Sequence, residues 1–123
     1  MSGFGFIVLG QPIPQKRHRH DGRRKGGAYR DPATQAYEHA VGLSAIAAGM
    51  RGETGPFNLR VSAWRKSAHR YDVDNLLKSV LDGMTRAGAL EDDNFTIVPI
   101  MWIEHMGTDK EHPRCVVVLE PIE

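Results

Sequence analysis

Residues 72–93 read DVDNLLKSVLDGMTRAGALEDD, and this stretch predicts an amphipathic helix with acidic residues at both ends. Its apolar side chains recur at the i, i+3, i+4, i+7 spacing of one helical face: Leu77, Val80, Leu81 and Met84. Aspartate is a common N-cap, and glycine commonly ends a helix. We therefore expect a helix from Asn75 to Ala87, with Asp74 as its N-cap and Gly88 as its stop.

The acidic residues around this helix suggest a bound cation. Asp72 and Asp74 stand at its start, and Asp92 and Asp93 follow its end. Two like charges about 4 Å apart repel by roughly 4 kcal/mol at an effective dielectric constant near 20. A cation would offset that repulsion. Oxygen ligands of this kind suit Mg²⁺ or Mn²⁺ better than Zn²⁺.

The helix also carries a lysine among its acids. Asp74, Lys78 and Asp82 are four residues apart and share one polar stripe. If a strand at Thr96–Glu104 packs beside the helix N-terminus, Asp93 can join the two acids that start the helix. In the alternative interpretation the acids cap a helix and form a solvated turn, and the lysine makes a surface salt bridge worth about 0.3–0.5 kcal/mol.

Charge divides the chain into two unlike halves. Residues 1–70 hold 12 lysines and arginines against 4 acids, a net charge of +8. Residues 71–123 hold 4 against 11, a net charge of −7. Such asymmetry favours interaction with nucleic acid.

Two basic clusters are candidates for contacts with DNA phosphates. The first is a glycine-interrupted stretch, expected to be a loop, with Lys16, Arg17, Arg19, Arg23, Arg24, Lys25 and Arg30. The second precedes the acidic motif and consists of Arg65, Lys66, His69 and Arg70. A solvated loop without a ligand is the alternative for the first cluster. His18 and His20 have no further zinc ligand at suitable spacing, so they add to this loop.

Length and composition predict one domain over residues 1–123, with the composition of an ordinary soluble protein. Cys115 has no partner for an intrachain disulfide, which is typical of a reducing cytoplasm. The apolar run Phe4–Leu9 is too short to span a membrane. We therefore expect a cytoplasmic protein.

The predicted elements follow the order β-α-β-α-β-β. We expect strands at Phe4–Leu9, Phe57–Trp64, Thr96–His105 and Arg114–Leu119, and a first helix at Ala33–Met50 after the cap Asp31-Pro32. The apolar run Cys115–Leu119 predicts a strand that is buried on both faces. The fold class is α+β (mixed α/β), with the helices packed on a small mixed sheet.

Two segments resemble the RusA family of Holliday-junction resolvases. The first is Asp72-Val-Asp-Asn-Leu-Leu-Lys78 with Asp82 and the pair at 92–93, which is similar to the family signature. The second, Gly10–Arg19 (GQPIPQKRHR), is similar to its N-terminal motif. The resemblance covers both ends of the chain and most of its length.

This resemblance implies roles for individual residues. It implies that Asp72, Asp74 and Asp93 bind the metal, with Asp92 as a further candidate, and that Lys78 is needed for cleavage. It also implies a homodimer. Some relatives carry a basic residue directly before the first aspartate. This chain has Tyr71 there, and the neighbouring Arg70 is a candidate replacement.

The function we expect is magnesium-dependent hydrolysis of branched DNA, with Mn²⁺ as a substitute metal and a four-way junction as the substrate. A four-way junction is two-fold symmetric, so a C2 homodimer would supply the paired cuts. One alternative is a metal-dependent nuclease that acts on RNA or flaps. The other is a DNA-binding module without catalysis.

Overall fold

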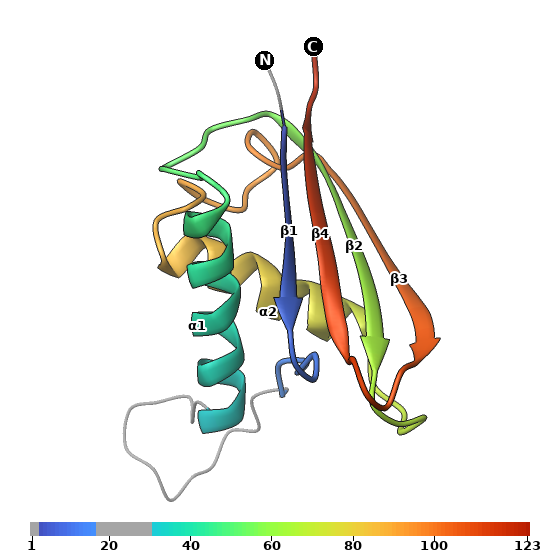
Figure 1. The fold of residues 1–123 in the computed structure, drawn as a ribbon. Helices are drawn as coiled ribbons and strands as arrows, with labels where there is room; N and C mark the ends of the chain where they lie inside the picture. Colours follow the sequence, from blue (N-terminus) through green and yellow to red (C-terminus); the bar gives the residue numbers. More distant parts are fainter. Residues whose placement is uncertain (1–2, 17–30) are drawn as a thin grey trace, which may run out of the picture.

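The computed structural model describes residues 3–16 and 31–123, which form a four-stranded sheet with two helices on one face (Figure 1). The elements are β1 (Phe4–Leu9), α1 (Pro32–Ala47), β2 (Phe57–Arg65), α2 (Val73–Arg86), β3 (Ile100–Thr108) and β4 (Arg114–Pro121). This confirms the expected fold class and element order. Several basic positions lie outside the described residues: Arg17, His18, Arg19, His20, Arg23, Arg24, Lys25 and Arg30.

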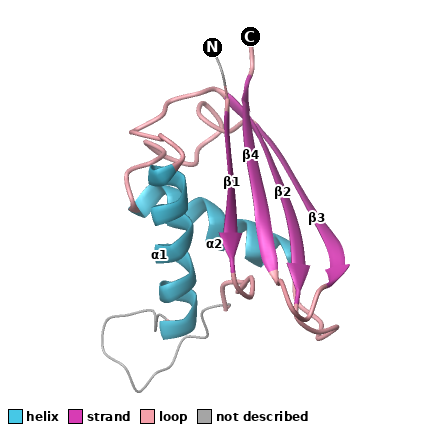
Figure 2. Cartoon of the chain, in the orientation of Figure 1, coloured by secondary structure: helices cyan, strands magenta, loops and turns pink. Residues whose placement is uncertain are grey.

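The sheet is mixed, with strand order β1-β4-β2-β3 (Figure 2). β4 pairs antiparallel with both β1 and β2, whereas β2 and β3 run parallel. A parallel pair needs a crossover, and α2 supplies it. The N-terminus of α2 therefore follows the carboxyl end of β2, the side of a β-α-β unit where ligand sites commonly form.

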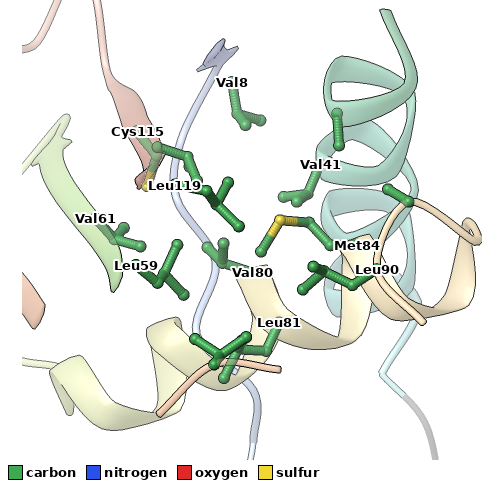
Figure 3. Packing of buried hydrophobic residues seen from close by; sticks show 14 of the residues in the cluster. Val8, Val41, Leu59, Val61, Val80, Leu81, Met84, Leu90, Cys115 and Leu119 are labelled. Carbon is green, nitrogen blue, oxygen red and sulfur yellow. The ribbon is translucent and has the colours of Figure 1, made fainter. Parts of the chain in front are cut away.

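The hydrophobic core lies between the helices and one face of the sheet (Figure 3). Side chains from β2 and β4 meet side chains from the helices there: Leu59, Val61, Cys115, Leu119, Val41, Val80 and Met84. Burial along β4 alternates, with Val116 and Val118 only partly buried. The prediction that this strand is buried on both faces was wrong, because both helices cover the same face of the sheet.

Helix α2 begins two residues earlier than expected. Its N-cap is Asp72, and Asp74 lies in the first turn. Leu76 is fully buried, whereas Leu77 is only partly buried against the core. Val80, Leu81 and Met84 of the predicted face are buried, and the buried face also extends to Leu76 and to Gly83, which packs closely against α1.

Helix α1 begins as its sequence predicts. The carboxylate of Asp31 accepts a hydrogen bond from the backbone N–H of Thr34 at 3.2 Å. The helix ends at Ala47 rather than Met50, because the chain turns at Gly49, whose φ is +99°. The buried side of α1 is formed by Thr34, Tyr37, Glu38, Val41, Gly42 and Ala45.

Strand β3 begins at Ile100, four residues later than expected. The preceding residues form a turn, in which the carbonyl of Asn94 accepts the N–H groups of Ile97 and Val98 at 3.0 and 2.9 Å. The side chain of Asn94 also accepts the N–H of Thr96 at 3.0 Å. Among the described residues, the helices are all too short or too polar to cross a membrane.

Candidate nuclease site

Two exposed carboxylates stand at the N-terminus of α2. Asp72 caps the helix through its backbone carbonyl, which accepts the N–H of Asn75 at 3.1 Å, while its side chain makes no cap hydrogen bond. The Asp72 carboxylate accepts a hydrogen bond from the side-chain amide of Asn75 at 3.4 Å. Asp74 lies in the first turn, and its carboxylate has no hydrogen bond or ion pair with the described residues. The helix dipole favours negative charge at this end. Both carboxylates are therefore available to a ligand.

Lys78 joins the polar stripe of α2 to the turn that precedes β3. Its Nζ lies 2.9 Å from Asp82 Oδ1 and 3.3 Å from Asp93 Oδ2. The hydrogen bond to Asp82 is the main reason why the pKa of Lys78 is raised, and the Asp93 carboxylate adds to it. Near neutral pH this residue is an ammonium, which suits charge stabilisation and not proton abstraction.

The two neighbouring acids at 92–93 differ in their contacts. The carboxylate of Asp92 accepts the backbone N–H of Asp93 at 2.7 Å and the side-chain amide of Asn94 at 3.1 Å. The backbone hydrogen bond is the main cause that lowers the pKa of Asp92. The Asp92 carboxylate thus stabilises the turn in which it lies, whereas the Asp93 carboxylate points towards Lys78 on α2.

The carboxylates at the start of α2 offer oxygen donors to a ligand. Within the described ranges, no three His, Cys, Asp or Glu side chains gather into a group that could hold a metal ion. Mg²⁺, however, is usually held by one or two carboxylates and completes its shell with water and substrate phosphates. The exposed oxygens of Asp72 and Asp74 fit that pattern.

The N-terminal segment docks against α2. The backbone N–H of Gln15 donates to the carbonyl of Asn75 at 3.0 Å. Its side-chain amide donates to Asp82, and to Glu38 Oε2 at 3.3 Å. The next residue, Lys16, forms an exposed ion pair with Asp31 at 3.3 Å. Gln15 lies within the Gly10–Arg19 motif, but the sequence alone indicates no role for it. Gln15 therefore fixes the N-terminal segment to α2 directly before Lys16.

The second basic cluster divides into buried and exposed members. Arg65 is only 9% exposed, and its Nε donates to the carbonyl of Pro12 at 3.2 Å. Its guanidinium carbon also lies 4.5 Å from the ring centroid of Tyr71. Lys66, His69 and Arg70 are exposed. Arg65 therefore binds the loop together, and the other three face solvent.

A histidine from β3 reaches this loop. Nδ1 of His105 lies 2.8 Å from the hydroxyl of Tyr71, and the two rings meet edge to face. A pocket of about 590 Å³ lies here, lined by Ala68, His69, Arg70, Tyr71, Asp72, Val73 and His105. Sequence reasoning assigned no role to His105, because 34 residues separate it from Tyr71 and only the strand register brings the two together.

Comparison with known proteins supports the resemblance in the two motifs. The family described as endodeoxyribonuclease RusA matches residues 10–120. The chain is also 28% identical over 101 residues to the crossover junction endodeoxyribonuclease RusA of Shigella sonnei (strain Ss046). The alignment covers 76% of each of the two chains. The family match spans the N-terminal segment, both helices, β2, β3 and β4 as far as Glu120. The chain therefore belongs to the RusA family of endodeoxyribonucleases.

Proposed function

We propose that residues 1–123 act as one endonuclease domain that resolves Holliday junctions by paired phosphodiester hydrolysis. Family membership supports DNA cleavage, and the curated relative is named for cleavage of crossover junctions. One observation carries the assignment of the site. Lys78 lies on the same polar stripe of α2 as Asp74, and its Nζ lies 3.3 Å from Asp93 Oδ2. The start of α2 and the turn that follows this helix therefore contribute to one charged surface.

In this proposal Asp72, Asp74 and Asp93 bind Mg²⁺, with Mn²⁺ as a substitute. When bound, the metal would supply Lewis-acid activation of the scissile phosphodiester. Asp72 and Asp74 lie at the N-terminus of α2, where they can orient a cation against an approaching DNA strand. The ammonium of Lys78 neutralises charge on the phosphate and positions it.

DNA would be held by the basic residues around this surface. Lys16, Lys66, His69 and Arg70 are exposed and available to backbone phosphates. The positions outside the described residues complete the set that we propose for DNA binding: Arg17, Arg19, Arg23, Arg24 and Lys25. The buried Arg65 contributes indirectly, because it fixes the carbonyl of Pro12 and the ring of Tyr71.

We further propose a C2 homodimer, because a four-way junction is two-fold symmetric and needs two cuts. The edge strand β3 is the surface that we propose for this contact. It carries exposed apolar side chains, Ile100, Met101, Trp102 and Met106. Long apolar edge strands are prone to pairing with another chain. The same strand carries His105 beside the acidic site, so a partner copy would lie near the cut.

The buried, lone thiol of Cys115 agrees with a cytoplasmic location, which we also propose. The decisive test compares cleavage of a synthetic four-way junction by the wild-type protein and by Asp74→Asn, with and without Mg²⁺. We expect paired cuts by the wild type only, and only with metal. Matched flap, linear duplex and RNA substrates are included. Equal cleavage of linear duplex would refute the junction assignment, and preferential cleavage of flaps or RNA would favour the alternative nuclease.

A further inference from the structure

The pocket beside Asp72 offers mainly hydrogen-bond donors to a ligand. Its walls come from the loop before α2 and from β3, and they include His69, Arg70 and His105. Asp72 is the one acid among the lining residues, and we assign it to the metal. A set of donors and cations next to a metal-binding carboxylate matches the chemistry of an anion, such as a phosphate group.

His105 is oriented by its neighbour. The phenol of Tyr71 can donate its hydrogen to Nδ1 of His105, 2.8 Å away. A neutral imidazole that accepts at Nδ1 carries its own hydrogen on Nε2. The side chain then presents an N–H donor on the side of the ring opposite Tyr71.

Tyr71 is itself held in place, so the imidazole is preorganised. Arg65 lies 4.5 Å from the centroid of the Tyr71 ring. The guanidinium of Arg65 is in turn fixed by the carbonyls of Pro12 and His69, at 3.2 and 3.4 Å. A donor that is fixed before binding loses less conformational freedom when it binds its ligand.

Strand register keeps the acid that precedes His105 in the chain, Glu104, away from the imidazole. His105 pairs with Ala63 of β2, which is fully buried on the helix side of the sheet. Glu104 pairs with Ser62, and successive side chains of a strand point to opposite faces. The carboxylate of Glu104 therefore belongs to the other face of the sheet and does not repel an anion in this pocket.

We propose that this pocket binds a backbone phosphate of the DNA next to the scissile one, with Nε2 of His105 donating to a phosphate oxygen. Arg70 and His69 line the same pocket and add positive charge or donors. His105 is thus a substrate-binding residue, and Tyr71 and Arg65 are positioning residues that act through it. The inference rests on the proposed function for DNA as the ligand and for the metal site at Asp72, which sets where the scissile phosphate lies.

The test measures junction binding without divalent metal, so that no cleavage occurs. One uncharged methylphosphonate is placed in turn at each phosphate near the expected cut. In the wild type we expect one position to weaken binding by about tenfold, the loss typical of a hydrogen bond to a charged group. We expect His105→Ala to bind the unmodified junction more weakly than the wild type by a similar factor. A methylphosphonate at the sensitive position should then weaken binding by this variant by less than about twofold further.

Two further variants and a control separate contact from structure. His105→Gln retains a side-chain N–H donor and should recover part of the lost affinity. Tyr71→Phe removes the hydroxyl and should weaken binding less than His105→Ala. His112→Ala, in the turn between β3 and β4, should bind like the wild type. Denaturation midpoints of all variants verify that they are folded.

Equal methylphosphonate effects in wild type and His105→Ala at every position would overturn the proposal. The proposal would also be overturned if His105→Ala cancelled the binding loss caused by an abasic nucleotide and not the loss caused by a methylphosphonate, because the pocket would then hold a base. The readout is independent of the cleavage assays. A protein that fails to prefer junctions would refute the proposed function, while the phosphate contact could still be measured on any DNA that it binds.

Discussion

Lys78 and Asp93 are linked across the connection between α2 and β3, with Nζ 3.3 Å from Oδ2. The two residues are 15 positions apart, and the turn at 92–94 brings the carboxylate back onto the helix. The same ammonium contacts Asp82 at 2.9 Å. A lysine that is held between two carboxylates has a defined position before any ligand arrives, as its proposed role in charge stabilisation requires.

Replacement of Lys78 should separate catalysis from binding. We expect Lys78→Gln to lower the cleavage rate of a junction by about 10²–10³, the range seen when one stabilising donor is removed from an active site. Junction affinity without metal should change little, because Asp82 and Asp93 already engage the Lys78 ammonium and the other basic residues supply the phosphate contacts. Single-turnover kinetics and a gel-shift titration measure the two quantities. Lys110→Gln in the β3–β4 turn is the matched control, and an equal rate loss there would contradict the assignment.

Replacement of Asp72 or Asp74 should affect cleavage more than replacement of Asp92, because the three carboxylates differ in their contacts. Asp72→Asn and Asp74→Asn each remove an available carboxylate, so we expect each to abolish Mg²⁺-dependent cleavage and to keep or tighten DNA binding through reduced repulsion. Asp92→Asn should keep most activity, because that carboxylate is engaged with the N–H of Asp93 in its own turn. Calorimetric Mg²⁺ titration of the protein–junction complex provides a second measurement. Loss of cleavage in Asp92→Asn with normal activity in Asp74→Asn would reverse the assignment.

Local patterns in the sequence predicted most elements because their signals are local. The bounds of β1 and the cap at Asp31 were predicted correctly, since an apolar run and an Asp-Pro pair act within a few residues. The burial of Gly83 on α2 was not predicted, because it depends on the close contact of this residue with α1. The two-sided burial of β4 was likewise wrong. Val116 and Val118 are only partly buried, because the two described helices cover one face of the sheet, and layer number is a global property.

The candidate site was only partly predictable for the same reason. The spacing of Asp74 and Lys78 follows from helix geometry, so sequence could place them on one stripe. The contact of Lys78 with Asp93 depends on how the following turn folds, and the sequence left it open. The pairing of Tyr71 with His105 depends on the parallel register of β2 and β3. Residue types alone do not encode that register.

The close contact between α1 and α2 predicts that a glycine-to-alanine substitution lowers stability, where such a change in a helix normally raises it. A Cβ at Gly83 would lie 2.7 Å from the carbonyl oxygen of Glu38 and 2.8 Å from Cβ of Val41. Glycine to alanine inside a helix normally stabilises by about 1 kcal/mol. We expect Gly83→Ala instead to lower the free energy of unfolding by about 1–3 kcal/mol through overpacking. Urea denaturation monitored by circular dichroism measures the change. A gain in stability would show that the two helices can separate without cost.

Burial of Cys115 predicts a loss of stability at alkaline pH. Desolvation raises the pKa of its thiol from the ordinary 9.0 to about 11 in the folded protein. Above pH 9 the unfolded chain ionises first, so its free energy falls relative to the fold. The contribution of the thiol is complete below pH 9 and declines up to about pH 11, by roughly 2–3 kcal/mol. The difference in unfolding free energy between wild type and Cys115→Ala should therefore shrink between pH 8 and 10.5. A constant difference would contradict the shift.

The proposed dimer contact through β3 predicts a change in both assembly and product. Trp102 and Met106 are 56% and 45% exposed on this edge strand, and a carboxylate at either position would be costly to bury in an interface. We expect Trp102→Glu and Met106→Glu to sediment as monomers at concentrations where the wild type is a dimer. On a supercoiled plasmid with an extruded cruciform, they should nick one strand where the wild type linearises. Leu43→Glu, an equally exposed apolar position on α1, is the control. Dimers and linear product from both β3 variants would exclude this strand as the contact, because two buried carboxylates would not be tolerated there.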